Sequence, residues 1–275
     1  MAFRILAWNC RGIVGNSRRR ALIDLIRQEK PKILFLSETL CDTKQLDTLR
    51  VKVGFDNCLG WPKDDENSRG VAFLWMNDVP VRIRNYSSRH VDVAIGVRGA
   101  PDEWRLTGIY GYAQTADRHE TWNLMRQLAS QSSLPWLIVG DFNEIVDNSE
   151  KTGGVPRRHV QMQGFREAMM DCSLLDMGFF GSPYTWSDYQ TKERLDRSLW
   201  NVELRNLFPS SRTTHLPPSS SDHSPLLVEV SETPIPQTGR RKPLFRFEQY
   251  WATHQECESV IQRGWQYASE GDPMS

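Results

Sequence analysis

Polar side chains stand at the ends of the most apolar segments of this chain, and this placement strongly constrains the fold. Asn9 follows FRILAW, Glu38 follows KILFLS and Asp141 follows WLIVG, while Asp222 and His223 precede SPLLVEV. Short apolar runs of this kind are typical of buried strands. A carboxylate beside such a core is costly unless a partner compensates its charge. A divalent cation is the simplest partner, and carboxylate and amide oxygens favour magnesium, manganese or calcium over zinc.

Taken singly, each of these residues also has an ordinary structural explanation. Asn9 can cap the turn that follows it, and Glu38 can belong to a loop. Asp141 in GDFN can form an Asx-turn with Asn143, and the Asp222-His223 pair in SSSDHSP can be a solvated loop. Their occurrence together, each at a strand end, is what favours a shared functional site.

The apolar runs alternate with loops and a few amphipathic helices. Strands are predicted at 3–9, 32–37, 70–75, 81–86, 91–97, 104–110, 136–140, 194–199 and 226–230. A first helix is predicted to be capped by Asn16-Ser17 and to end before Pro31, and further helices are predicted at 118–129 and 160–171. Only the first helix lies between two strands that could be parallel, whereas 70–110 resembles an antiparallel meander. The pattern predicts an α/β fold with two packed sheets flanked by helices, rather than a doubly wound parallel sheet.

Two regions of different character divide the chain. Residues 1–230 carry the strand and helix pattern and are predicted to form one domain. Residues 231–275 begin with SETPIPQTGRRKP, which is typical of a linker, and continue with the amphipathic stretch FRFEQYWATHQECESVIQRGW. We interpret this tail as the start of a further region downstream.

Composition excludes several classes of protein. No apolar run is long enough to span a membrane, and the first residues lack the features of a secretory signal. The five cysteines are scattered without a CxxC, so neither a disulfide framework nor a zinc knuckle is predicted, and an intracellular location is expected. The 34 basic and 34 acidic residues balance, which disfavours a protein that holds nucleic acid by bulk electrostatics alone.

Six short motifs, in order along the chain, carry a family resemblance. They are WN (8–9), SET (37–39), GIYG (108–111), GDFNE (140–144), RLDR (194–197) and SDHSP (221–225). Together they resemble the exonuclease-endonuclease-phosphatase superfamily, which includes apurinic endonucleases, pancreatic-type deoxyribonuclease and inositol polyphosphate phosphatases. The resemblance implies the deoxyribonuclease-like four-layer fold and metal-dependent hydrolysis of a phosphate ester.

Further segments are similar to one branch of this superfamily. WNCRG, SEKTGG at 149–154, YTWSD at 184–188 and the tail resemble the endonuclease portion of plant LINE-type (non-LTR) retrotransposons. This similarity implies DNA as the substrate, a nick that leaves a 3′-hydroxyl end, and a reverse transcriptase region downstream. It also implies a nuclear location, toward which the basic cluster at 240–242 is weak support.

The resemblance assigns the metal-binding residues. Glu38 would bind the ion, with Asp222 contributing directly or through water, and Asn9 would orient Glu38 or a metal-bound water. Mg²⁺ is the expected ion and Mn²⁺ an alternative, with one or two ions left open. Apurinic endonucleases have an acidic residue two positions after the Asn of the first motif, and here that position is Arg11. Fewer carboxylates would then hold the metal, and strong specificity for abasic sites is not expected.

The remaining catalytic roles also follow from the resemblance. Asp141 would orient or deprotonate the attacking water, and His223 would face the scissile phosphate as a donor or a base, so the identity of the general base stays open. Asn143 and Tyr110 would donate hydrogen bonds to phosphate oxygens. Asp196 would orient His223 and raise its pKa.

Three residues are candidates for contact with DNA. Arg157 and Arg158 follow GDFN closely and could track a phosphate backbone, or could lie in an ordinary solvated loop. Trp186 could pack beside the scissile phosphate or fill the core. Two other functions are compatible with the sequence: a phosphatase acting on a phosphorylated small molecule or lipid headgroup, and a retrotransposon remnant without catalysis.

Overall fold

The computed structural model describes residues 3–63, 69–218, 220–233 and Ser259. Met1–Ile235 forms one compact unit and Pro236–Ser275 a second. The predicted linker and amphipathic tail begin at residue 231. Apart from residues 231–233 and Ser259, they lie outside the described residues. Within the described ranges, no helix is both long and apolar enough to span a bilayer.

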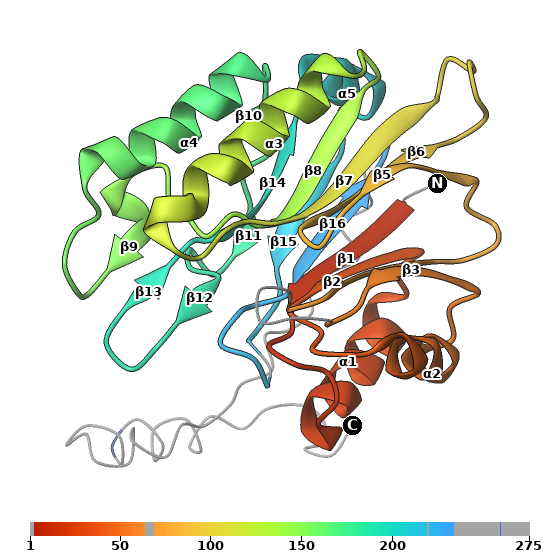
Figure 1. The fold of residues 1–275 in the computed structure, drawn as a ribbon, viewed down its shortest axis with the longest axis horizontal. Helices are drawn as coiled ribbons and strands as arrows, with labels where there is room; N and C mark the ends of the chain where they lie inside the picture. Colours follow the sequence, from red (N-terminus) through yellow and green to blue (C-terminus); the bar gives the residue numbers. More distant parts are fainter. Residues whose placement is uncertain (1–2, 64–68, 219, 234–258, 260–275) are drawn as a thin grey trace. The chain divides into compact units, whose positions relative to one another are not determined.

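Two large mixed sheets form the body of the first unit (Figure 1). The seven-stranded sheet has the order β11 (Phe180–Gly181), β15 (Arg212–His215), β16 (Leu226–Val230), β1 (Phe3–Asn9), β2 (Ile33–Ser37), β4 (Val71–Trp75) and β3 (Asn57–Trp61). The six-stranded sheet has the order β10 (Leu175–Asp176), β14 (Asp196–Trp200), β8 (Trp136–Asp141), β7 (Trp104–Tyr110), β6 (His90–Ile95) and β5 (Val81–Tyr86). A small third sheet joins β12 (Trp186–Ser187), β13 (Lys192–Glu193) and β9 (Lys151–Thr152).

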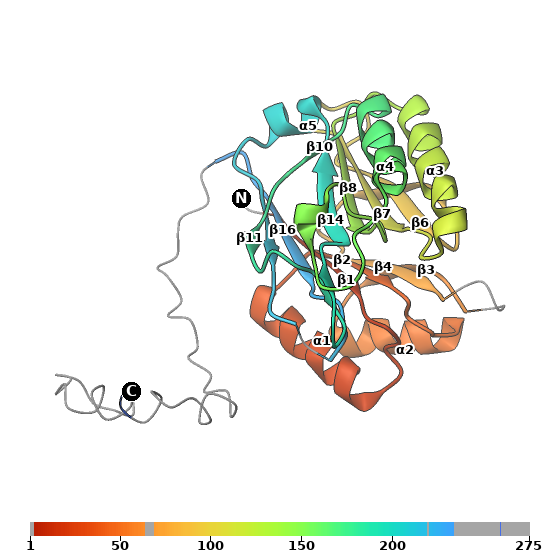
Figure 2. The same ribbon diagram turned by 90° about the vertical axis from the view of Figure 1, so that its left-hand side faces the viewer.

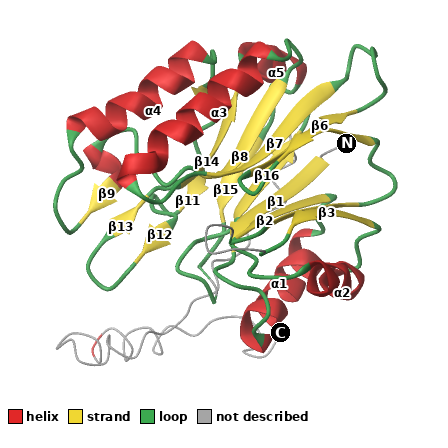
Figure 3. Cartoon of the chain, viewed as in Figure 1, coloured by secondary structure: helices red, strands yellow, loops and turns green. Residues whose placement is uncertain are grey.

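Helices cover the outer face of each large sheet, which gives four layers (Figures 2 and 3). Helices α1 (Asn16–Glu29) and α2 (Thr43–Val53) pack on the seven-stranded sheet, and α3 (Arg118–Ser130) and α4 (His159–Asp171) pack on the six-stranded sheet. The short α5 (Val202–Leu207) follows β14, and the single turns η1 (Thr115–Asp117) and η2 (Asn148–Glu150) lie in loops. The predicted two-sheet sandwich flanked by helices is confirmed.

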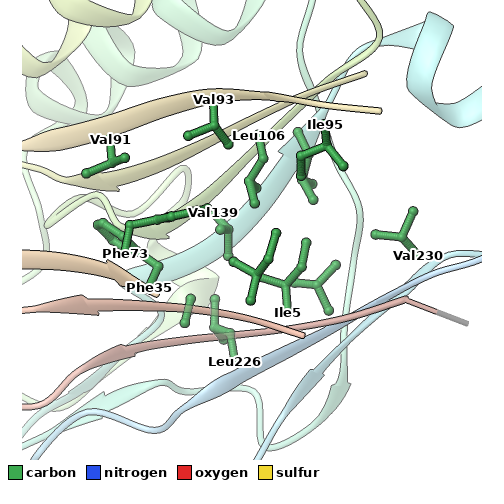
Figure 4. Close-up of a cluster of buried hydrophobic side chains, with 14 of the residues drawn as sticks. Ile5, Phe35, Phe73, Val91, Val93, Ile95, Leu106, Val139, Leu226 and Val230 are labelled. Carbon is green, nitrogen blue, oxygen red and sulfur yellow. The ribbon is translucent and has the colours of Figure 1, made fainter. Parts of the chain in front are cut away.

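The two-residue period of the strands explains why their sequences are apolar throughout. In β1, Ile5 and Ala7 point into the core between the sheets, whereas Leu6 and Trp8 point to the layer under the helices. The other central strands divide their side chains in the same way, so both faces are buried. Figure 4 shows side chains of the inter-sheet core, among them Phe35 from one sheet and Val139 from the other.

The start of the first helix differs from the prediction. Gly15 is the N-cap residue, and no side-chain hydrogen bond caps the helix. The Asn16 side chain accepts a hydrogen bond from the guanidinium of Arg19 instead of capping a backbone N–H. The prediction that Asn16-Ser17 caps this helix is therefore wrong, while its end before Pro31 is confirmed.

Helix α2 and strand β3 were not predicted. Helix α2 starts with a capping box, in which Asp42 accepts from the backbone of Gln45 and donates its own N–H to that side chain. Its buried face consists of Leu46, Leu49 and Val53, too few apolar residues to stand out among the polar ones around them. The two-residue strands show no periodicity in the sequence at all.

Candidate active site

Strand register brings three of the predicted residues into one row of the six-stranded sheet. Tyr110 pairs with Asp141 across parallel β7 and β8, and Asp196 pairs with Asp141 across antiparallel β14 and β8. All three share the strand face that lines the inter-sheet core, because each lies an even number of residues from a core side chain of its strand. In the other sheet, Asn9 pairs with Ser37, so Glu38 is the first residue beyond β2 at the same edge.

Hydrogen bonds join the two sheets at this edge. The Asn9 amide donates from Nδ2 to Oε1 of Glu38 at 3.0 Å and to Oδ2 of Asp141 at 2.9 Å. The Tyr110 hydroxyl donates to the same Glu38 oxygen at 3.0 Å. All four residues are buried. Because the donors point at carboxylate oxygens, the cluster stabilises both ionised carboxylates without solvent.

His223 completes the cluster from the loop before β16. Its Nδ1 lies 2.8 Å from Oδ2 of Asp196, and its Nε2 lies 3.8 Å from Oδ2 of Asp141. The Trp8 indole donates a hydrogen bond to the His223 carbonyl at 3.0 Å, which holds the loop against β1. The buried imidazole thus lies between two carboxylates, with Nε2 directed toward Asp141.

The charges of this group shift two pKa values upward. Burial and the neighbouring Asp196 charge raise the pKa of Asp141 to about 7. Burial lowers the pKa of His223, but the charges of Asp196 and Asp141 outweigh burial and raise that pKa to about 9. Both shifts favour the protonated forms of His223 and Asp141.

Two of the predicted site residues have left-handed backbone conformations, which are uncommon for residues other than glycine. Glu38 has a φ of 52° and Asn143 a φ of 54°. The Asn143 backbone N–H donates to Oδ1 of Asp141 at 2.8 Å, and its side-chain amide donates to the Gly111 carbonyl at 3.0 Å. This Asx-turn and the functional role are thus compatible, because the turn fixes the Asp141 carboxylate. Strained backbone of this kind is often found at functional sites.

The carboxylates of Glu38 and Asp222 are each bound by an arginine. Arg69 donates to Oε2 of Glu38 at 2.9 Å. Arg11 binds Asp222 through Nε at 3.1 Å and Nη2 at 3.0 Å, and its Nη1 lies 3.7 Å from Glu38 Oε2. Burial raises the pKa of Glu38, but the Asn9 hydrogen bond and the Arg11 and Arg69 charges together hold it below its usual value. Burial also raises the pKa of Asp222, but the His223 charge and hydrogen bonds from Trp186 and Arg11 hold it below its usual value, so both carboxylates are ionised near neutrality.

Trp186 belongs to the site as well as to the core. Its indole N–H donates to Oδ2 of Asp222 at 2.9 Å, and its ring packs against a small cluster that includes Ile145 and Leu195. The Ser187 backbone N–H also donates to the Asp222 carbonyl, at 3.1 Å. Trp186 therefore both contacts a predicted metal-binding residue and packs in the core. Its contact with DNA stays a prediction.

The donor set fits a hard divalent ion. Glu38 and Asp222 offer carboxylate oxygens, and burial raises the pKa of the nearby Cys10 thiol to about 12, so no thiolate is available there for a soft metal. Ligand atoms of Asp141, Asp196 and His223 form a second group, all within 4.8 Å of one another. The residues therefore suit a hard divalent ion, with Arg11 between the first two carboxylates.

The two candidate arginines of the DNA-contact prediction differ in exposure. Arg157 forms ion pairs with Glu144 at 3.2 Å and Glu193 at 2.5 Å, and only 15% of its side chain is exposed. Arg158 is exposed at the start of α4. Arg157 thus pairs with two carboxylates of the protein itself. Contact of either arginine with DNA stays a prediction.

The sequence did not predict the contact of Arg69 with Glu38, nor the ion pairs that Arg11 forms with Asp222 and Glu38. Arg69 lies just before β4, where no periodicity connects it with Glu38. Arg89 was also missed, although its guanidinium lies 4.8 Å from the centre of the Tyr110 ring and 4.2 Å from that of Tyr112. Of these three arginines, only Arg11 could be singled out from the sequence, because it stands where apurinic endonucleases have an acidic residue.

Comparisons with known proteins agree with this geometry. The model of the Endonuclease/Exonuclease/phosphatase family matches residues 6–223. No curated protein sequence matches the chain. Among solved structures, the 3′-5′ exonuclease NExo from Neisseria meningitidis is 20% identical, with a TM-score of 0.61, covering 83% of this chain and 100% of that one.

Two further solved structures share the fold. The AP endonuclease LMAP from Leishmania major is 15% identical, with a TM-score of 0.63, covering 84% of this chain and 88% of that one. The endonuclease domain of TRAS1, a telomere-specific non-LTR retrotransposon, is 14% identical, with a TM-score of 0.59, covering 85% of this chain and 100% of that one. At these identities the likeness shows the fold.

Proposed function

Since the chain belongs to the Endonuclease/Exonuclease/phosphatase family, we propose that it is a magnesium-dependent endonuclease that nicks duplex DNA and leaves 3′-hydroxyl ends. The observation that carries this proposal is the buried group of Asp141, His223 and Asp196, joined to Glu38 through Asn9. A base with a pKa near 7 beside a protonated imidazole suits general acid–base chemistry on a phosphodiester.

In the proposed reaction, a water oxygen attacks phosphorus in line with the 3′ oxygen, whose bond to phosphorus breaks and which takes a proton from solvent to give the 3′-hydroxyl. Asp141 takes the proton of the water, because its raised pKa makes it a competent base near neutrality. His223 donates from Nε2 to a non-bridging phosphate oxygen, and Asp196 holds the ring through Nδ1. A divalent ion held by Glu38 and Asp222 would supply the positive charge that stabilises the transition state and the leaving oxygen.

Asn143 and Tyr110 are proposed to position the phosphate. Asn143 can turn its amide from the Gly111 carbonyl to a phosphate oxygen while its backbone N–H keeps its bond to Asp141. Tyr110 keeps its proton, because burial and the Glu38 charge raise its pKa. It can therefore act only as a hydrogen-bond donor or acceptor, and not as a base.

The retrotransposon assignment is part of the same proposal. It is supported by WNCRG, SEKTGG and YTWSD, and the TRAS1 likeness adds agreement in fold. A reverse transcriptase region as partner, a plant host and a nuclear location go with this assignment. The neutral net charge supports transient contact with DNA rather than a tight non-specific grip.

A plasmid assay tests the proposal. Supercoiled plasmid is incubated with the protein in Mg²⁺, in Mn²⁺ and in chelator, and the nicked ends are extended with a polymerase that requires a 3′-hydroxyl. The wild type is expected to nick with metal only, and to leave ends that extend. Asp102→Asn is the matched control, because Asp102 is exposed in the turn before β7, at the opposite end of that strand from Tyr110.

Two other results would assign a different function. Release of phosphate from small-molecule or lipid-headgroup esters without plasmid nicking would indicate a phosphatase on the same fold. A folded protein that neither cleaves nor binds a divalent ion would be an inactive remnant.

A further inference from the structure

A guanidinium group stands between the two carboxylates proposed to hold the metal. Arg11 binds both oxygens of Asp222 through Nε and Nη2, at 3.1 and 3.0 Å, and its third nitrogen, Nη1, lies 3.7 Å from Glu38. Arg69 donates to the same Glu38 oxygen, Oε2, at 2.9 Å. Arg11 is thus the cation that bridges both carboxylates in this structure.

The backbone of Arg11 is fixed, whereas its side chain has a route to solvent. The residue has a left-handed φ of 49°, its N–H donates to Oδ1 of Asn9 at 3.3 Å, and its carbonyl accepts from Arg18 at 2.6 Å. Its side chain is 35% exposed, and the Asp222 side chain 33%. The guanidinium can therefore leave Asp222 for water while the chain around it stays in place.

A divalent ion and this guanidinium compete for the same oxygens. A metal ion needs the lone pairs that Arg11 now uses, and two cations within a few ångströms repel each other in a site partly shielded from water. We propose that Arg11 is a tethered competing cation, so that divalent metal binds Glu38 and Asp222 only when the guanidinium leaves Asp222. The inference rests on the proposed function only for the identity of the two ligands.

Metal binding without DNA tests this inference directly. Mn²⁺ is titrated into the wild-type protein and into Arg11→Gln, Arg11→Lys and Arg20→Gln, and dissociation constants are measured by calorimetry. Gln removes the charge at position 11 and Lys keeps it. Arg20→Gln is the matched control, because Arg20 is exposed on α1 and its loss changes the net charge equally.

We expect Arg11→Gln to tighten Mn²⁺ binding by about 10- to 100-fold, the range in which residues around a metal site tune affinity. Arg11→Lys should bind about as weakly as the wild type, and Arg20→Gln should match it. Damage to the fold would weaken metal binding, so tighter binding has no explanation in misfolding. Metal-induced stabilisation against thermal unfolding should follow the same order.

Several outcomes would overturn the inference. Equal or weaker binding in Arg11→Gln, or no measurable binding in that variant, contradicts it. If Arg20→Gln tightens Mn²⁺ binding equally, the effect comes from net charge. If Arg11→Lys tightens Mn²⁺ binding equally, the charge at position 11 does not compete with the metal. Plasmid nicking is scored separately: tighter metal binding in Arg11→Gln by a protein that cleaves no DNA would leave this inference standing and defeat the proposed endonuclease.

Discussion

Asn9 of one sheet donates a 2.9 Å hydrogen bond to Asp141 of the other, so its side-chain amide links the two halves of the sandwich, as the Tyr110–Glu38 bond also does. The same Nδ2 donates its second hydrogen to Glu38 at 3.0 Å. Both hydrogens of the amide are thus used by carboxylates that would otherwise repel each other. The bond also fixes how the proposed metal ligand lies relative to the proposed base, because each carboxylate sits on a different sheet.

Replacement of Asn9 should therefore impair catalysis more than folding. Asn9→Ala leaves Glu38 and Asp141 without their shared donor, which should raise the pKa of both carboxyl groups and loosen their geometry. We expect nicking to fall about 10- to 100-fold, the scale typical of residues that orient metal ligands. Nicking rates across pH measure the effect, and an unchanged rate with an unchanged pH profile would contradict the role of Asn9.

Asn9, Glu38, Asp141 and His223 were predictable because each stands at the end of an apolar strand, whereas Tyr110 and Asp196 followed from the family resemblance. The two-residue period of β7 and β8 places Tyr110 and Asp141 on the face that lines the core, although both faces of these strands are buried. What the sequence could not supply is the pairing of Asp196 with Asp141. That contact depends on β14 lying beside β8, a long-range choice that local patterns do not encode.

The arginines around Glu38 were beyond prediction for a similar reason. Arg69 lies just before β4, and reaches Glu38 because β4 pairs with β2 in the register that places Val71 opposite Ser37. Helix α2 was missed because its capping box precedes a mostly polar segment. Tertiary pairing, rather than local propensity, decided these parts of the structure.

Loss of the proposed base or of the imidazole should abolish most activity. Asp141→Asn and His223→Ala are each expected to lower the nicking rate by about 10²- to 10⁴-fold, the usual contribution of general acid–base groups. Circular dichroism should show an intact fold for both variants, and Asp102→Asn should nick as the wild type does. Cleavage at the wild-type rate by either variant would show that the role assigned to that residue is wrong.

The stability of the metal-free protein should depend on pH through His223. Its pKa is raised from 6.5 to about 9 in the folded state, so folding favours the protonated ring. This contribution is fully present below pH 6.5 and is lost as pH rises through about 9. The raised pKa of Asp141 has an effect of the same sign. Its contribution to stability is lost as pH rises from 3.8 to about 7, because folding favours the protonated carboxyl group.

Urea denaturation in chelator measures this dependence. We expect the free energy of unfolding to fall between pH 6.5 and pH 9, and the slope to flatten in His223→Gln. Asp196→Asn should also reduce the slope, because the Asp196 charge is the main cause that raises the pKa of His223. A slope of the opposite sign in the wild type would mean that the ring is neutral in the folded protein.

Gly140 should not tolerate a side chain. It precedes Asp141 with a φ of +145°, and a Cβ at this position would collide with the Ile109 carbonyl oxygen of the neighbouring strand. Gly140→Ala must distort β8 where it carries Asp141, and we expect it to lower the free energy of unfolding by about 2–4 kcal/mol. Nicking should fall as well, because the carboxylate shifts with its strand.

Gly15→Ala is the control, since Gly15 has a φ of −68° and open space around a Cβ. This substitution should lower the free energy of unfolding by less than about 1 kcal/mol. Equal stability of the two variants, measured by urea denaturation, would mean that the close approach of β7 and β8 at Gly140 can relax without cost.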